Sequence, residues 1–177
     1  LFSIGLMLIC SFDFHLYTGR ICYIVNKNEE STKTRILKLF LALIGNLVGT
    51  IVFGTVLNLM FKDAKPALFN ALDNMVNTKL DYPWYKMLIL SIFCGIMVFL
   101  AVDGFKKIEG FSKYLVLALC IGGFIIMGFE HSIANMFYFF CNMTYSLKAV
   151  LYIIICIIGN SIGGVLFPLL YKAAKSE

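Results

Sequence analysis

Four polar residues interrupt a long apolar run in the second half of the chain. Glu130, His131, Ser132 and Asn135 lie within GFEHSIANMF, inside an apolar stretch that extends from residue 114 to residue 140. An imidazole can take up or release a proton near neutral pH, because its ordinary pKa is about 6.5. Ionisable groups at bilayer depth cost about 2.5–3.5 kcal/mol each on insertion scales, so they usually mark a conduction path or a proton relay. The segment therefore predicts a site that acts on a charged solute or on protons.

A second polar interruption lies near the start of the chain. The segment SFDFHLYTGR, residues 11–20, places His15, Thr18 and Arg20 directly after a short apolar stretch. Gly19 permits a positive φ angle, and the Thr18 hydroxyl can bond nearby backbone groups. We therefore expect the helix to break here as well.

Composition indicates that both interruptions lie in a membrane. Hydrophobic residues make up 60% of the chain, charged residues 14%, and the mean hydropathy is +0.88, which is outside the usual range for a soluble domain. A helix needs about 20 residues to cross a hydrocarbon core of about 30 Å. Runs of sufficient length lie near 39–61, 84–102, 114–140 and 149–171, and a shorter run covers 1–12. We predict an all-α protein that crosses the cell (plasma) membrane several times.

An internal repeat relates the two halves. The segment IGNLVGT recurs as IGNSIGG, which places Asn46 and Asn160 at matching positions 114 residues apart, and the two histidines, His15 and His131, are 116 apart. A repeat of three helices contains an odd number of crossings, so the second copy enters the membrane from the opposite side. Folds with such inverted repeats place their binding sites near the midplane, at discontinuous helices.

The repeat also predicts how the chain is organised. In the second half a full span precedes the interrupted helix, whereas in the first half the interrupted helix comes first, so we expect the first transmembrane helix to be absent from this chain. Residues 1–177 then form a single transmembrane domain. Its parts are the remainder of the first repeat (1–61), an extracytoplasmic connection (62–83), and the second repeat with a cytoplasmic tail (84–177).

Charge distribution predicts the orientation. The loop 26–38, the loop after Asp103 and the tail together hold nine basic residues, against five at the opposite ends of the spans. The positive-inside rule then places the C-terminus in the cytoplasm. The net charge of +5 is spread over short loops, so nucleic acid is not an expected partner. Six cysteines without a Cys-x-x-Cys pair predict reduced thiols, and the sequence predicts neither a cofactor nor a metal.

GFEHSIANMF is similar to the signature of the formate/nitrite transporter family, and LYTG resembles its LFTG loop. FSIGLMLI and IGNLVG match the family's pattern as well. The resemblance implies an aquaporin-like protomer in a homopentamer, surrounded by membrane lipid, with one pore in each protomer. It also implies transport of small monovalent anions, chiefly formate or nitrite, with proton coupling through a central histidine.

The resemblance implies roles for particular residues. His131 corresponds to the central pore histidine and Thr18 to the loop threonine that approaches it. The cytoplasmic constriction falls on Leu6, Phe124 and Phe2, the outer constriction on Leu16, Tyr17 and Val98, and the vestibule lysine on Lys79. Glu130, Asn135, Asn46 and Asn160 are expected to be structural partners. The chain departs from the family pattern at His15, Tyr17 and Gly95, which changes the polarity expected along the pore.

Other functions remain open at this point. A hydrosulfide channel of the same family would use the same residues. A water or glycerol channel would share the architecture, but the paired Asn-Pro-Ala segments typical of such channels are missing from the sequence. A membrane-embedded enzyme is the most distant alternative, because the sequence contains no His-Glu-x-x-His motif and no glycine-rich phosphate loop.

Overall fold

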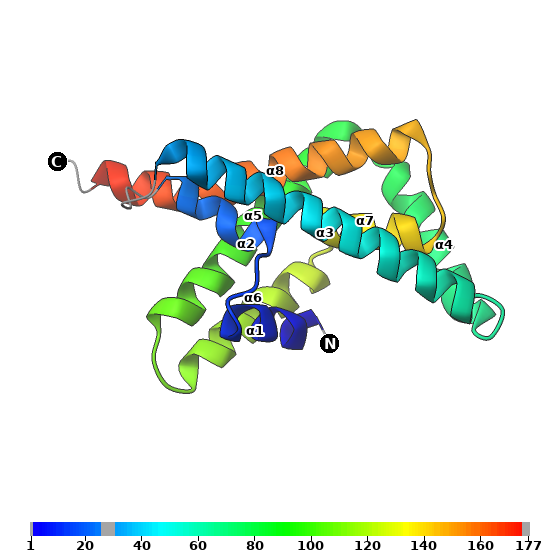
Figure 1. Cartoon of the computed structure of the whole chain (residues 1–177), viewed down its shortest axis with the longest axis horizontal. Helices are drawn as coiled ribbons and strands as arrows, with labels where there is room; N and C mark the ends of the chain where they lie inside the picture. The colour runs from blue at the N-terminus through cyan, green and yellow to red at the C-terminus, as the bar shows by residue number, and fades with distance from the viewer. Residues whose placement is uncertain (1, 26–30, 175–177) are drawn as a thin grey trace.

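The computed structural model describes residues 2–25 and 31–174, and every regular element within these ranges is a helix. The first half contains α1 (Phe2–Ser11), α2 (Tyr17–Arg20), the short 3-10 helix η1 (Ile21–Ile24) and α3 (Thr32–Phe61). The connection and the second half contain α4 (Pro66–Leu80), α5 (Trp84–Lys107), α6 (Ser112–Ile126), α7 (Ser132–Cys141) and α8 (Leu147–Ala174) (Figure 1). The predicted all-α class is confirmed.

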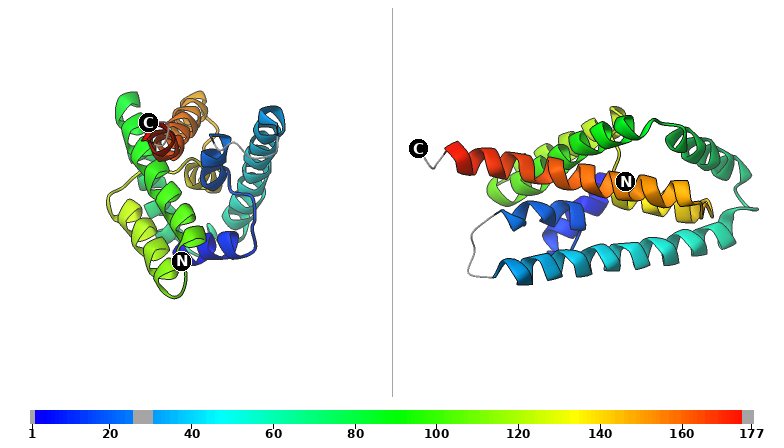
Figure 2. Two further views of the ribbon diagram at one scale, coloured as in Figure 1. Left: turned by 90° about the vertical axis from the view of Figure 1, so that its left-hand side faces the viewer. Right: turned by 90° about the horizontal axis from the view of Figure 1, so that it is seen from above.

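Three helices, α3, α5 and α8, are long and apolar enough to cross a membrane. The α3 helix begins before the apolar run near residue 39, because Ser31 accepts the Thr34 N–H at 3.2 Å and caps a polar first turn. The α3 and α8 helices extend along the long axis of the molecule, and α5 crosses beside α8 (Figures 1 and 2).

Both predicted interruptions are breaks between short helices. The apolar run 114–140 is divided into α6 and α7, and the chain turns at Gly128, whose φ is +66°. The first break separates α1 from α2 and turns at Asp13, whose φ is +53°. Half-helices that end inside a bilayer leave backbone groups without helical partners, so other groups must satisfy them.

Glycines bring α5 and α8 into close contact. A Cβ atom on Gly163 would lie 2.0 Å from the Ile92 carbonyl oxygen, and one on Gly159 would lie 2.8 Å from the Leu88 carbonyl oxygen. Close packing at the glycines of the repeated motif is therefore present in the second repeat. In the first repeat, Gly45 and Gly49 have nothing within 4 Å in the described part of the chain, so the same contact is not formed there.

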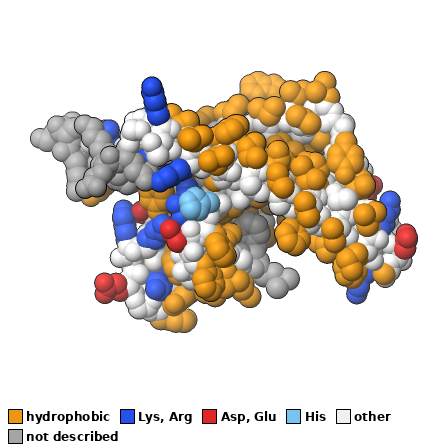
Figure 3. Space-filling view, in the orientation of Figure 1, with side chains coloured by type: hydrophobic (Ala, Val, Ile, Leu, Met, Phe, Trp, Pro, Cys, Tyr) orange, Lys and Arg blue, Asp and Glu red, His pale blue; other side chains and the backbone are white. Residues whose placement is uncertain are grey.

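The outer surface matches a lipid environment between two charged ends. Figure 3 shows hydrophobic side chains over most of one face, with charged side chains gathered toward either end. Large apolar residues on α3, such as Val48, Val52 and Phe53, are 51–68% exposed. Apolar patches of this extent on a protein surface mark contact with lipid or with another protein.

Candidate functional site: the break between the half-helices

The two breaks meet at a buried histidine. His131 is the residue before the first turn of α7, and its Nε2 lies 2.9 Å from the Thr18 hydroxyl, the two side chains coming from segments 113 residues apart. Both residues are at most 3% exposed. The family resemblance implies that His131 and Thr18 belong to one pore, although they lie in different segments of the sequence. The fold brings their side chains into hydrogen-bonding contact.

The backbone of α7 selects the tautomer of His131. The ring Nδ1 accepts the Ala134 N–H at 3.2 Å and so caps the helix. A nitrogen that accepts a hydrogen bond carries no proton, so the neutral ring has its proton on Nε2 and donates it to Thr18. Placing a second proton on the ring would displace the Ala134 N–H from Nδ1. The charge of His131 is therefore linked to the first turn of α7.

Two asparagines hold the two breaks in the same way. The Asn160 side chain accepts the Ser132 N–H at 2.8 Å and donates to the Glu130 carbonyl at 2.9 Å. The Asn46 side chain accepts the Tyr17 N–H at 3.0 Å and donates to the His15 carbonyl at 3.2 Å. Each amide thus satisfies backbone groups that the break leaves without helical partners.

The hydrogen bonds made by the Asn46 and Asn160 side chains, which we call the Asn46 and Asn160 clamps, correct the alignment of the two repeats. They shift it by one residue from the alignment that pairs His15 with His131. Each asparagine bonds the residues on either side of one central position, which is His131 in the second break and Leu16 in the first. The two histidines are therefore not equivalent. His131 is buried, whereas His15 is exposed and occupies the position that Glu130 has in the other repeat.

Gly95 is the residue on α5 that makes room for the Asn160 clamp. A Cβ atom at this position would lie 2.3 Å from the Asn160 carbonyl oxygen and 3.0 Å from its Cα. The structure thus gives a physical reason for the departure noted at Gly95, because this backbone contact excludes any larger residue there.

Replacing Gly95 with alanine should therefore disturb the His131 loop through Asn160. We expect a loss of about 1–3 kcal/mol of stability, the usual cost of overpacking a tight contact. The thermal unfolding midpoint of the solubilised protein measures this loss. Gly122→Ala is the control, since a Cβ on that α6 glycine meets nothing within 4 Å. Equal midpoints for the two variants would contradict the role assigned to Gly95.

Lys79 is paired with a buried carboxylate. Its Nζ lies 2.5 Å from Glu130 Oε2, and the Asn135 Nδ2 donates to the same oxygen at 2.9 Å. The Lys79 side chain is 13% exposed and that of Glu130 is 2% exposed. The sequence placed Lys79 in a vestibule and Glu130 and Asn135 among structural partners, and the structure joins all three in one network.

The predicted constriction residues fall into two clusters. Leu6, Leu16, Val98 and Phe124 belong to one buried cluster, and the Phe124 ring stacks near the His131 ring, with 6.2 Å between centroids. Tyr17 belongs to another cluster, and its hydroxyl lies 2.9 Å from Ser161 Oγ. Phe2 begins α1, but its side chain is outside the described residues.

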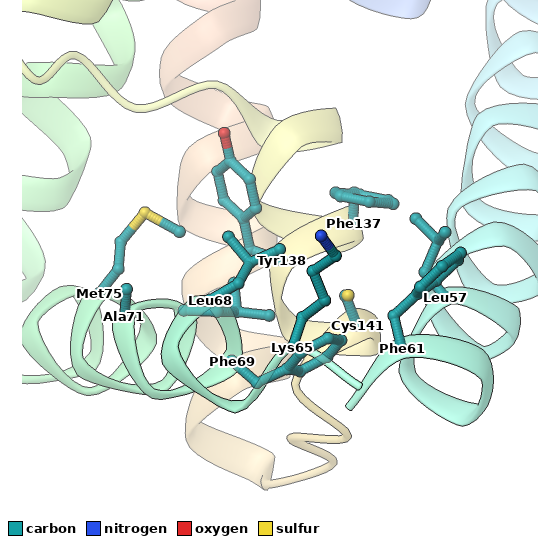
Figure 4. Close-up of a pocket in the computed structure, with 11 residues that line it drawn as sticks. Leu57, Phe61, Lys65, Leu68, Phe69, Ala71, Met75, Phe137, Tyr138 and Cys141 are labelled. Carbon is teal, nitrogen blue, oxygen red and sulfur yellow. The ribbon is translucent and has the colours of Figure 1, made fainter. Parts of the chain in front are cut away.

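A cavity of about 370 Å³ adjoins His131 and is lined almost entirely by apolar groups, among them Leu6, Ile9 and Phe137. A second cavity of about 450 Å³ lies between α3, α4 and α7. Figure 4 shows that residues from all three helices surround it, including Phe61, Phe69 and Tyr138, and that Lys65 extends beside them. The first cavity has the imidazole in its wall and is therefore the one that can expose a solute to proton chemistry.

Two polar groups at the site were not assigned a role from the sequence. The Ser132 hydroxyl is buried next to His131 and has no hydrogen-bond partner among the described residues. The Cys156 thiol donates to the Glu130 carbonyl at 3.2 Å. The sequence includes Ser132 among the polar residues that interrupt the apolar run, whereas Cys156 has no signal in the sequence beyond an apolar neighbourhood. All six cysteines are free, as predicted.

The chain is similar to known membrane transporters over about three quarters of its length. It is 27% identical over 144 residues to the nitrite transporter NirC of Salmonella typhimurium, covering 76% of this chain and 54% of that protein. It is 33% identical over 146 residues to the formate channel FocA of Escherichia coli, covering 77% of this chain and 50% of that protein. The chain thus spans about half the length of these curated relatives.

A solved structure, described as a pentameric formate channel with formate bound, has the same fold. Its TM-score with this protein is 0.83 at 23% sequence identity, and the superposition covers 99% of this chain and 81% of that one. The family model for formate/nitrite transporters matches residues 1–174. The chain belongs to the formate/nitrite transporter family, because the family model matches nearly its whole length.

Proposed function

We propose that the whole protein conducts small monovalent anions, formate or nitrite, across the cell membrane through a path that passes His131. The observation that carries this proposal is the buried contact between His131 and Thr18 at the meeting point of two broken helices. The apolar residues Leu6, Leu16, Val98 and Phe124 close the path around this contact. Relatives described as a nitrite transporter and a formate channel support the choice of substrate class.

An anion in this path must lose most of its water. Isolated charges are strongly disfavoured in an apolar environment, so the path must stabilise the charge or neutralise it. When the His131 ring is neutral, its Nε2–H and the Thr18 hydroxyl are two hydrogen-bond donors that lie 2.9 Å apart. An approaching anion favours the imidazolium, and the Nε2 proton of that cation can neutralise the anion. This step requires a proton on Nδ1 and therefore the temporary loss of the Ala134 cap.

The proposed assembly is a homopentamer in the plasma membrane with one path in each protomer. The solved channel of the same fold is described as pentameric, and exposed apolar residues on α3 provide surfaces for lipid or for a neighbouring subunit. We propose that the C-terminus is cytoplasmic, according to the distribution of basic residues. We also propose that the transmembrane domain consists of the remainder of the first repeat (1–61), an extracytoplasmic connection (62–83), and the second repeat with the tail (84–177).

Solute uptake into proteoliposomes that contain the full-length protein tests the function. We expect uptake of formate or nitrite and no uptake of glycerol, because the buried donors favour an anion and the apolar constriction excludes a larger polar solute. Hydrosulfide uptake, measured in parallel, identifies the preferred anion. Glycerol uptake at a rate comparable to that of formate would favour a neutral-solute channel and overturn the proposal.

A further inference from the structure

The tyrosine that precedes Thr18 is bonded to α8. The Tyr17 hydroxyl lies 2.9 Å from Ser161 Oγ, although the two residues are 144 positions apart in the sequence. Ser161 donates its own proton to the Ile157 carbonyl oxygen at 2.6 Å. Because a hydroxyl has only one proton to donate, the Tyr17 hydroxyl is the donor and Ser161 Oγ is the acceptor. The fold therefore determines the direction of this hydrogen bond.

The α2 helix, which carries Thr18, depends on contacts of this kind because it is only four residues long. A single turn forms few hydrogen bonds of its own, so neighbouring elements must fix its orientation. Asn46 on α3 accepts the Tyr17 backbone N–H at 3.0 Å, and Ser161 on α8 accepts the Tyr17 hydroxyl. The first turn of α2 is thus held from two long helices at once.

Tyr17 holds this turn from outside the constriction. Its ring belongs to a buried cluster with Ile21 and Leu39, whereas the apolar residues that close the proposed path form a separate cluster. A change at Ser161 therefore reaches a solute in the path through Tyr17 and Thr18 and not through direct contact with the solute.

Two consecutive residues of α8 support the two breaks. Asn160 bonds the backbone on both sides of His131. The next residue, Ser161, bonds the side chain of the residue before Thr18. One turn of α8 thereby supports both members of the 2.9 Å contact between the Thr18 hydroxyl and His131 Nε2.

The other repeat does not form the corresponding bond. In the alignment that the clamps define, Ser132 matches Tyr17, and Leu47 matches Ser161. The Ser132 hydroxyl has no hydrogen-bond partner among the described residues, and a leucine side chain has no polar group to offer. The bond between Tyr17 and Ser161 is therefore specific to the break that carries Thr18.

We propose that Ser161 is a positioning residue for transport. Its bond with the Tyr17 hydroxyl holds the Thr18 hydroxyl next to His131 Nε2, where the anion passes. This inference rests on the proposed function, because it concerns the same path. Without the bond, Thr18 is less well oriented, and an anion that needs its hydroxyl as a donor passes more slowly.

Formate uptake by four full-length proteins in proteoliposomes tests the proposal: the wild type, Ser161→Ala, Thr18→Val and the double variant. We expect Ser161→Ala to lower the uptake rate per assembled protein about two- to tenfold, the effect of one hydrogen bond. In the Thr18→Val background the same change should have no further effect, because the hydroxyl that it positions is already gone. The same fold-reduction in both backgrounds would show that Ser161 does not act through Thr18.

Three further variants serve as controls. Ser161→Thr retains a hydroxyl and should keep the uptake rate of the wild type. Tyr17→Phe removes the donor and should reproduce the rate of Ser161→Ala; a wild-type rate in Tyr17→Phe would contradict the proposal. Tyr145→Phe removes a tyrosine hydroxyl from a side chain that is 60% exposed, and we expect no change in uptake.

Thermal unfolding of the same four proteins tests the positioning of Thr18 without any solute. We expect Ser161→Ala to lower the unfolding midpoint less in the Thr18→Val background, because the bond between Thr18 and His131 is already lost there. Additive changes in the midpoint would overturn the proposal, whether or not the wild type transports formate. Coupled midpoints in a wild type that takes up no formate would instead overturn the proposed function alone. Should Ser161→Ala fail to assemble, Tyr17→Phe replaces it in both measurements.

Discussion

Replacing His131 with asparagine should make formate flux independent of pH and leave the assembled protein intact. Asparagine cannot take up a proton between about pH 5 and pH 8, the range in which an imidazole titrates. Its side-chain oxygen can still accept the Ala134 N–H, since asparagine is among the preferred residues at this helix position. Its side chain is shorter than the imidazole, so its amide lies farther from the Thr18 hydroxyl than Nε2 does. The substitution therefore removes the titratable group and preserves the hydrogen bond that caps α7.

The measurement is formate uptake into proteoliposomes across this pH range, with the mass of the solubilised protein as a check on assembly. His15→Asn is the matched control, because His15 is exposed and the Thr18 hydroxyl is bonded to His131. We expect a smaller effect from that control. A pH profile that is unchanged in a correctly assembled His131→Asn protein would remove His131 from any proton-coupled step.

The second large effect concerns the pair of Lys79 and Glu130. Replacing Lys79 with methionine leaves the Glu130 carboxylate buried without its cation, while Asn135 still donates to it. Removing one partner of a buried ion pair typically costs about 3–5 kcal/mol. We expect the thermal unfolding midpoint of Lys79→Met to fall accordingly, and the double variant Lys79→Met/Glu130→Gln to regain most of the loss.

Formate flux through the double variant then distinguishes a role of Lys79 in stabilising the fold from a role in attracting anions. If the lysine also attracts anions, the double variant will be stable but will transport formate more slowly than the wild type. Lys148→Met is the control, since Lys148 lies 3.9 Å from an exposed Asp81 and such surface pairs contribute about 0–1 kcal/mol. Wild-type stability in Lys79→Met would show that the pair is not required for the fold.

Much of the fold could be predicted because the bilayer restricts what a chain can do. A backbone in lipid must satisfy its own hydrogen bonds, so long apolar runs must be helices. This physical rule located the spans that became α3, α5 and α8. It also identified the two breaks, because polar groups such as Glu130 and His131 would not be placed at this depth without a partner.

The relation between the breaks required the tertiary structure. Matching types of residue suggested that His15 and His131 are equivalent, but spacing in a sequence does not show which backbone groups are left without partners. The Asn46 and Asn160 clamps do show this, and they pair His131 with Leu16. The repeated glycine motif likewise does not show which glycines pack closely. Gly159 packs against α5, whereas Gly45 faces open space among the described residues.

Hydropathy and polar interruptions are properties of the chain, so they are enough to indicate the class of the protein, its spans, and His131 and Thr18 as residues to examine. The packing of the helices establishes that these two side chains meet, that Nδ1 of His131 caps α7, and that Lys79 is paired with Glu130. The physical reason is that hydrogen bonds and ion pairs extend over about 3–4 Å. Contacts so short between residues far apart in the chain depend on how the helices pack.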